Sequence, residues 1–211
     1  MTRLVGWLGI IALALAGRYF GNTLLSAACL PALLLLLALS APAALRAGLA
    51  MLAAVGALAI AAGFAEQALD ATPALIAGLV GWLFARTLVG GRTPLIARAI
   101  AAIDGPDQLA DAAVAHYARR LTQIWALYQG LLAVIALLLA VCAWRWPHDL
   151  VSLPGPRLFG MVVLPLAVAA LALGEYALRP ALLPQAPRRS LWSFVRDLVH
   201  AWPSILNDAT H

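Results

Sequence analysis

Charged residues are scarce in this sequence, and lysine is absent altogether. Only 11% of the 211 residues are charged, whereas 64% are hydrophobic. A water-soluble domain of this size needs a largely polar surface, and so few polar residues cannot provide one. The composition therefore excludes an ordinary soluble globular domain.

The usual signatures of catalytic and metal sites are also missing. Cys29 and Cys142 lie inside apolar runs without metal-ligand spacing, so we interpret them as packing residues. The chain contains no Gly-x-Ser-x-Gly motif, no phosphate-cradling glycine loop and no His-x4-Asp pair of the acyltransferase type. We identify no catalytic residue and expect neither a cofactor nor a metal ion.

Long apolar stretches are what the sequence has in abundance. Runs of about 18 or more apolar residues indicate helices that cross a bilayer, and these runs lack the alternation of a β-barrel. We predict an all-α polytopic membrane protein with a single helical membrane domain over residues 1–178. Six transmembrane helices are expected, at about residues 4–20, 23–45, 47–64, 72–89, 121–143 and 158–178.

The first of these spans is the shortest and has a second interpretation. Arg3 precedes it and Ala14-Leu15-Ala16 lies near its end, a pattern that also occurs in signal peptides. We prefer a retained helix to a cleaved segment or one that lies flat on the membrane.

Small residues at four-residue spacing predict close helix packing in the third and fourth spans. They are Ala53, Ala57 and Ala61 beside Gly56, and the pairs Ala74/Gly78 and Ala77/Gly81. The fourth span is expected to begin with Thr72 as a cap and Pro73 in the first turn. In the second span, Pro31 should bend the helix and Arg46 should end it.

The longest polar interruption, residues 90–120, connects the fourth and fifth spans. Residues 94–103 have the periodicity of an amphipathic helix on the membrane surface. The breaker Asp104-Gly105-Pro106 should end it, and a second polar helix is expected from near Asp107 into the fifth span. Residues 179–211 form a polar tail with a predicted interfacial helix at about residues 190–202.

The arginines lie near the ends of the predicted spans, and their distribution predicts the orientation. Eleven lie on one side of the six-span arrangement: Arg3, Arg46, Arg86, Arg92, Arg98, Arg119, Arg120, Arg179, Arg188, Arg189 and Arg196. Arg18, Arg145 and Arg157 lie on the other. The positive-inside rule then places both termini and the long connection in the cytoplasm. Because the charges are dispersed in this way, the net charge of +5 does not indicate nucleic-acid binding.

Glu175 is the most unusual single residue, because an acid in a membrane helix needs a partner or a wet cavity. Arg179 lies four residues later on the same helix face and could pair with it, as could Arg119 or Arg120. A structural ion pair is preferred, and a proton relay stays open as the alternative.

A candidate functional cluster combines the start of the fifth span with the end of the sixth. Its members are Tyr117, Arg119, Arg120, Thr122, Trp125, Glu175, Tyr176 and Arg179. Arginines beside aromatic residues usually anchor a helix at the interface, but guanidinium groups could also bind a phosphate or carboxylate headgroup. Pro94, Arg98 and Gln129 are secondary candidates.

Residues 84–179 contain three short motifs in a distinctive combination. They are Thr93-Pro94-Leu95-Ile96 with Arg98, Tyr117 with Arg119-Arg120, Thr122 and Trp125, and Gly174-Glu175-Tyr176 with Arg179. In this combination the chain resembles a family of small bacterial inner-membrane proteins found with enzymes of aryl-polyene and xanthomonadin-type pigment biosynthesis. Ala118 stands where members often carry threonine, and the first four spans match only in hydropathy.

Some members of that family carry the name ketosynthase, but this activity does not carry over. A β-ketoacyl synthase needs an activated cysteine with histidine partners in a large soluble fold, and neither cysteine here has that setting. We expect a non-enzymatic membrane component that anchors cytosolic fatty-acid- or polyketide-type enzymes or presents the acyl product to the bilayer. A small transporter or flippase for an amphiphilic lipid, and a membrane transferase with an unrecognised site, are the alternatives.

Overall fold

The structure is a computed structural model of the chain, and it describes residues 10, 12–13, 16–17, 19–40, 43–145 and 155–182. Within these residues all regular structure is helical and no strand occurs, which confirms the all-α class. They fall into two compact units, drawn from Met1–Pro73 with Leu137–Arg157 and from Ala74–Ala136 with Leu158–His211. Most of the expected first span and the tail helix lie outside the described residues.

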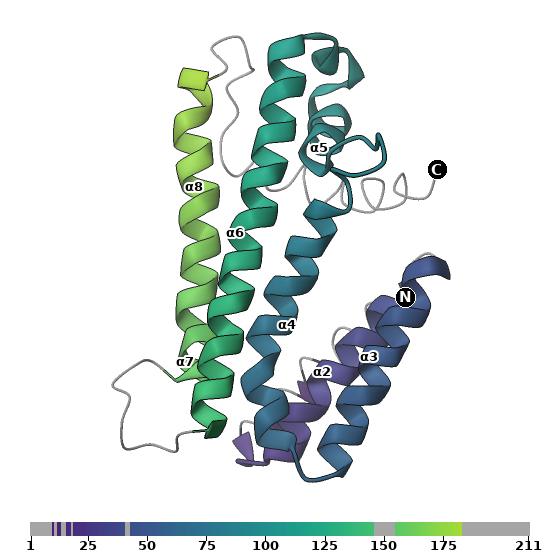
Figure 1. Cartoon of the computed structure of the whole chain (residues 1–211), viewed down its shortest axis with the longest axis vertical. Coiled ribbons are helices and arrows are strands. Elements are labelled where there is room, and N and C mark those ends of the chain that lie inside the picture. Colours follow the sequence, from purple (N-terminus) through teal and green to yellow (C-terminus); the bar gives the residue numbers. More distant parts are fainter. Residues whose placement is uncertain are drawn as a thin grey trace. The chain divides into compact units, whose positions relative to one another are not determined.

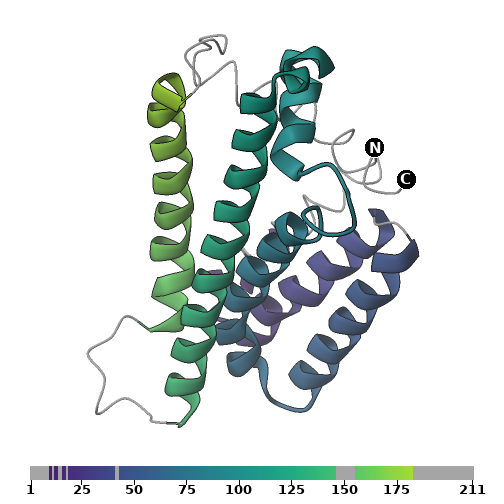
Figure 2. The same cartoon turned by 45° about the horizontal axis from the view of Figure 1, so that its top comes forward.

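Helices α2 (Thr23–Ser40) and α3 (Ala43–Ala61) pack side by side in the first unit (Figures 1 and 2). Pro31 lies inside α2, as predicted. The expectation that Arg46 ends this helix is wrong, because α2 already ends at Ser40 and Arg46 lies in the first turn of α3.

The face of α3 that packs on α2 differs from the predicted alanine stripe. Leu49 and Ala53 are buried, and a Cβ built on Gly56 would lie 4.0 Å from the Pro31 Cβ. Ala57 and Ala61 are exposed instead. A strict four-residue spacing drifts about 40° per step around a helix, so only part of such a stripe can face one neighbour.

Helix α4 (Ala65–Ala85) begins earlier than predicted, and Thr72 does not cap it. The Thr72 hydroxyl donates to the Ala68 carbonyl oxygen at 2.8 Å, and Pro73 lies inside the helix. The Thr72 hydroxyl therefore has its acceptor within the helix and does not lie at the helix end. Glu66 lies in the first turn, where the helix dipole favours an acid.

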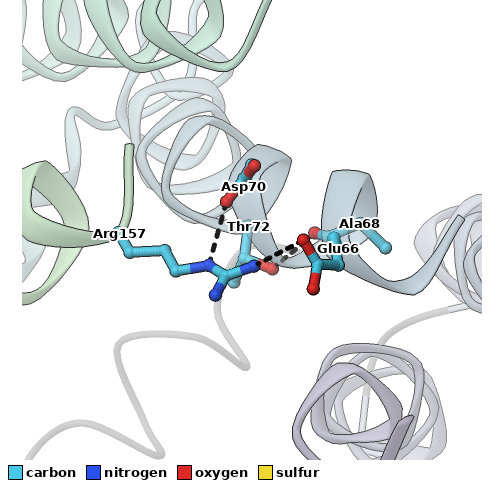
Figure 3. A network of polar contacts seen from close by, with 5 residues as sticks. All are labelled: Glu66, Ala68, Asp70, Thr72 and Arg157. Carbon is cyan, nitrogen blue, oxygen red and sulfur yellow. Dashed lines mark hydrogen bonds and ion pairs between the residues drawn. The ribbon is translucent and has the colours of Figure 1, made fainter. Parts of the chain in front are cut away.

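A polar network joins the start of α4 to α7 (Pro156–Leu158), as Figure 3 shows. The Arg157 Nε donates to the Asp70 Oδ1 at 3.1 Å, and its Nη2 lies 3.6 Å from the Glu66 Oε2. The Arg157 side chain is half exposed, so these ion pairs contribute little stability. They show that these two parts of the chain lie together.

The carboxyl-terminal half of α4 packs closely on α6 (Ala112–Arg145) through small residues, as predicted from their spacing. Ala77 is buried, and a Cβ built on Gly81 would lie 3.2 Å from both the Gln129 Cβ and the Gly130 backbone nitrogen. A glycine is therefore needed for the two helices to approach this closely.

The connection between α4 and α6 folds into two short helices. The expected amphipathic helix is α5 (Leu95–Asp104), which ends at Gly105 with φ 97°, and a 3-10 turn η1 (Pro106–Ala110) follows. Helix α6 begins at Ala112, where the Asp111 carboxylate accepts a hydrogen bond from the Ala113 N–H at 2.8 Å. From there α6 continues unbroken to Arg145. We call residues 86–122 the polar cap.

The last described helix contains a proline near its start. A π-helical turn η2 (Phe159–Val163) leads from α7 into α8 (Leu164–Leu182), with Pro165 in the first turn of α8. A wider turn at this point accommodates a residue that has no N–H and crowds the preceding turn. Helix α8 runs beside α6 in Figures 1 and 2, and the Tyr128 hydroxyl donates to the Ala167 carbonyl oxygen at 3.0 Å.

Three helical stretches are long and apolar enough to cross a bilayer: Ala65–Ala85, Ala112–Arg145 and Pro156–Arg179. Two further apolar helices, Thr23–Leu39 and Arg46–Ala61, are shorter. Large hydrophobic side chains are exposed along these helices, for example Leu127 and Leu138. Water disfavours such surfaces and lipid does not, so these features indicate a membrane protein.

Replacement of Gly81 by alanine tests the close packing of α4 on α6. The added methyl group would lie 3.2 Å from a backbone nitrogen, whereas at Gly78 it would meet the Ala133 Cβ at an ordinary 3.9 Å. We expect Gly81→Ala to be about 1–3 kcal/mol less stable than Gly78→Ala, because only the first overpacks the contact. Thermal unfolding in detergent micelles measures the difference, and equal stabilities would contradict the packing.

Candidate functional site

The amino-terminal end of α5 is held by two buried threonine hydroxyl groups. Thr87 accepts a hydrogen bond from the Leu95 N–H at 3.1 Å, and Thr122 of α6 accepts one from the Ile96 N–H at 3.3 Å. Each hydroxyl donates in turn to a carbonyl oxygen close by in its own segment, both at 2.7 Å. Since the first N–H groups of a helix have no partner within it, these hydroxyls tie α5 to the end of α4 and to α6.

Tyr117 of α6 and Glu175 of α8 are joined by a hydrogen bond. The Tyr117 hydroxyl donates to the Glu175 Oε1 at 2.5 Å, and both residues are half-buried. A short hydrogen bond to a carboxylate is stronger than a neutral one, and it offsets part of the cost of an acid in an apolar helix. Two members of the predicted cluster therefore meet across two helices.

Arg179 of α8 forms an ion pair with Asp104, the last residue of α5. The Arg179 Nη2 lies 3.5 Å from the Asp104 Oδ2, and the Asp104 side chain is only 7% exposed. The predicted ion pair of Glu175 is thus replaced by the Tyr117 hydrogen bond. A nearly buried carboxylate at the carboxyl end of a helix dipole has the greater need of a cation, which explains the choice of Asp104.

Arg119 and Arg120 are exposed at the start of α6. The residue before them, Ala118, is completely buried in a small core with Ala97 and Ile100 of α5. Because successive residues of a helix point about 100° apart, burial of Ala118 turns both arginines outward. Neither arginine takes part in an ion pair with another described residue.

Trp125 and Gln129 pack against α4. The Trp125 ring stacks on that of Phe84, with centroids 5.5 Å apart and an interplanar angle of 11°. Gln129 is buried where Gly81 approaches α6. These contacts give both residues a structural role in helix packing.

The remaining candidates lie at the ends of α5 and α8. Pro94 directly precedes α5, and the Arg98 Nε donates to the Thr93 carbonyl oxygen at 3.0 Å. Tyr176 is half-buried beside Glu175 in α8.

Sequence reasoning missed two residues that position the polar cap, Thr87 and Asp104. Asp104 carried a signal, because an acid in the last turn of a helix opposes the dipole and therefore requires a cation nearby. The signal at Thr87 was weaker: a hydroxyl residue lies at the end of an apolar span and shortly before another predicted helix, whose first N–H groups need acceptors.

Comparisons of the chain with models of known protein families, with curated proteins and with solved structures give no match. Within the described part of the chain, no three histidine, cysteine, aspartate or glutamate side chains lie close enough together to hold a metal ion. The geometry of the polar cap and the sequence motifs therefore carry the functional argument.

Removal of the Tyr117 hydroxyl tests the link between α6 and α8. Tyr117→Phe leaves the half-buried Glu175 carboxylate without this donor, and we expect a loss of about 1.5–3 kcal/mol in unfolding free energy. Tyr128→Phe is the matched control, because it removes a neutral hydrogen bond of 3.0 Å between the same two helices. This control should cost about 0.5–1.5 kcal/mol. Thermal unfolding of both variants in the same detergent measures the two losses. An equal loss of stability in both variants would contradict a stronger hydrogen bond between Tyr117 and the Glu175 carboxylate.

Proposed function

We propose that this protein is a non-enzymatic accessory component of an aryl-polyene or xanthomonadin-type lipid pathway. In this proposal it lies in the bacterial inner membrane and holds soluble fatty-acid- or polyketide-type enzymes at the cytoplasmic face. The motif resemblance supports the pathway, and three helices long enough to cross a bilayer support the membrane location.

The proposed topology has six spans, with both termini in the cytoplasm and the fourth span ending at Ala85. Helices α2 and α3 have 18 and 19 residues, so they extend about 27–28 Å, close to the bilayer core of about 30 Å. The link of Arg157 to Glu66 and Asp70 needs these residues on one side of the membrane. The proposed topology meets this requirement, because the connections that precede the fourth and the sixth span both lie on the side opposite the termini.

The outward position of Arg119 and Arg120 is the observation that carries an anchoring role. Two acids at this end of the helices, Asp104 and Glu175, already have partners within the chain. Helix α6 has 34 residues, which extend about 51 Å, so its first turns would project beyond a bilayer core of about 30 Å. Two arginines on a rigid projecting helix are suited to bind an acidic protein surface.

Charge reversal tests the anchor. In the full-length protein, Arg119→Glu with Arg120→Glu should reduce co-purification of the soluble ketosynthase-type enzymes of the pathway by about tenfold or more, because attraction becomes repulsion. Quantitative mass spectrometry after mild solubilisation measures the retained enzymes. Arg145→Glu reverses an exposed arginine at the other end of α6 and should have no effect. Undiminished retention by the double variant would refute the anchor.

Orientation is measured on the same variants, because charge reversal can invert a membrane protein. Gln67 and Gln108 are exposed and lie on opposite sides in the proposed topology. In a cysteine-free chain, Gln67→Cys should react with an impermeant thiol reagent in spheroplasts, and Gln108→Cys only after lysis. The reverse pattern would contradict the topology, and an unchanged pattern in the double variant would exclude inversion as the cause of lost partners.

A small transporter or flippase is the second candidate, favoured by the Tyr117–Glu175 hydrogen bond. A half-buried acid among apolar helices is the kind of group that binds or releases a cargo. In reconstituted vesicles, the protein would move a labelled amphiphilic lipid between leaflets, and Glu175→Gln would abolish the movement. No movement by the unmodified protein would exclude this candidate, whereas turnover of an acyl substrate by the pure protein would favour the transferase.

A further inference from the structure

Three arginines, Arg86, Arg92 and Arg98, lie in the short segment that contains the turn between α4 and α5. Arg86 directly follows the last residue of α4, Arg92 lies in the loop, and Arg98 lies in the first turn of α5. Gly90 and Gly91 have φ values of 73° and 70°, which residues with a side chain rarely adopt. These two glycines let the chain reverse direction between the arginines.

Two of the guanidinium groups are held in place but have unused donors. The Arg86 Cζ lies 4.9 Å from the centroid of the Trp82 ring, and the Arg98 Nε donates to the Thr93 carbonyl oxygen at 3.0 Å. The Arg86 Nε and the Arg98 Nη1 are buried and find no acceptor in the described part of the chain. A buried cationic donor without an acceptor is costly, so these atoms point to a missing partner.

The electrostatics of the cluster point to an anion. Burial, and then the positive charges of Arg98 and Arg92, lower the pKa of the Arg86 guanidinium. The ion pairs among the described residues involve Arg157 and Arg179 and none of these three arginines. Among the described residues, no ion pair therefore neutralises the positive charge of this cluster.

We propose that Arg86, Arg92 and Arg98 bind the phosphate group of an anionic phospholipid. Guanidinium groups bind phosphate oxygens in a bidentate manner, and a phosphate would neutralise part of the positive charge of this segment. The cluster lies at the end of α4, a helix long and apolar enough to cross a bilayer, where headgroups are present at high concentration. The bound headgroup would hold α5 on the membrane surface. This site uses neither Arg119 nor Arg120 and does not depend on an enzyme partner.

Lipid binding to the full-length protein tests the site. The protein is delipidated in a neutral detergent, and its binding of phosphatidylglycerol and of phosphatidylcholine is followed by native mass spectrometry. Phosphatidylglycerol should bind more tightly, and Arg86→Gln or Arg98→Gln should weaken this binding about tenfold through loss of a charge-assisted hydrogen bond. Arg145→Gln, which removes an exposed arginine far along α6, should leave it unchanged.

Arg92→Gln keeps the test decisive if the other variants fail to fold, because Arg92 is exposed and its loss should weaken binding without disturbing buried contacts. Wild-type affinity in Arg92→Gln and in every folded Arg86 or Arg98 variant would overturn the proposal, as would equal affinity for phosphatidylcholine. Complete displacement of the lipid by inorganic phosphate, with the same dependence on these arginines, would assign the site to free phosphate and overturn the lipid assignment. Retention of pathway enzymes is measured separately, so failure of the anchor and failure of this site are distinguishable.

Discussion

The polar cap depends on the hydroxyl groups of Thr87 and Thr122, which satisfy the first backbone N–H groups of α5. Beside apolar helices there is little water to do so, and a helix of ten residues is not stable by itself. The two hydroxyls hold the first turn of α5 against the end of α4 and against α6, and the ion pair between Asp104 and Arg179 holds its last residue against α8. Because Arg98 lies between these two points, the position of its guanidinium group follows from both.

The helices were largely predictable from the sequence, whereas several of their boundaries were not. A helix in contact with lipid must be apolar over a set length, so the later expected spans fall on α4, α6 and α8. The predicted boundaries were wrong where polar residues are helical: Thr72 and Pro73 lie within α4, and the threonine hydroxyl donates to a carbonyl oxygen of the same helix. The stripe of Ala53, Ala57 and Ala61 failed for a related reason, since spacing alone does not say which face of a helix meets its neighbour.

Within the candidate site, the sequence indicated which residues lie near the same end of α6 and α8, but not which ones touch. Tyr117 and Glu175 were placed in one cluster because both lie near the predicted cytoplasmic ends of their spans, and the structure joins them. The partner of Arg179 could not be deduced in the same way, because the rotation of α8 and the end point of α5 decide between Glu175 and Asp104. Hydropathy contains no information about either quantity, while the helix dipole at Asp104 does indicate that a cation is needed.

Burial of the guanidinium groups distinguishes the kinds of partner that the arginines can bind. Arg179 is largely buried and pairs with an acid of the same chain, so its charge serves the fold. Arg86 and Arg98 each have a buried nitrogen without an acceptor among the described residues, and in the proposed lipid site they share one phosphate group. Arg119 and Arg120 are open to solvent along one helix, where the desolvation cost of binding is low and a broad acidic surface can approach. In the two proposals, the same residue type therefore supports folding, lipid binding and partner binding in and beside the polar cap.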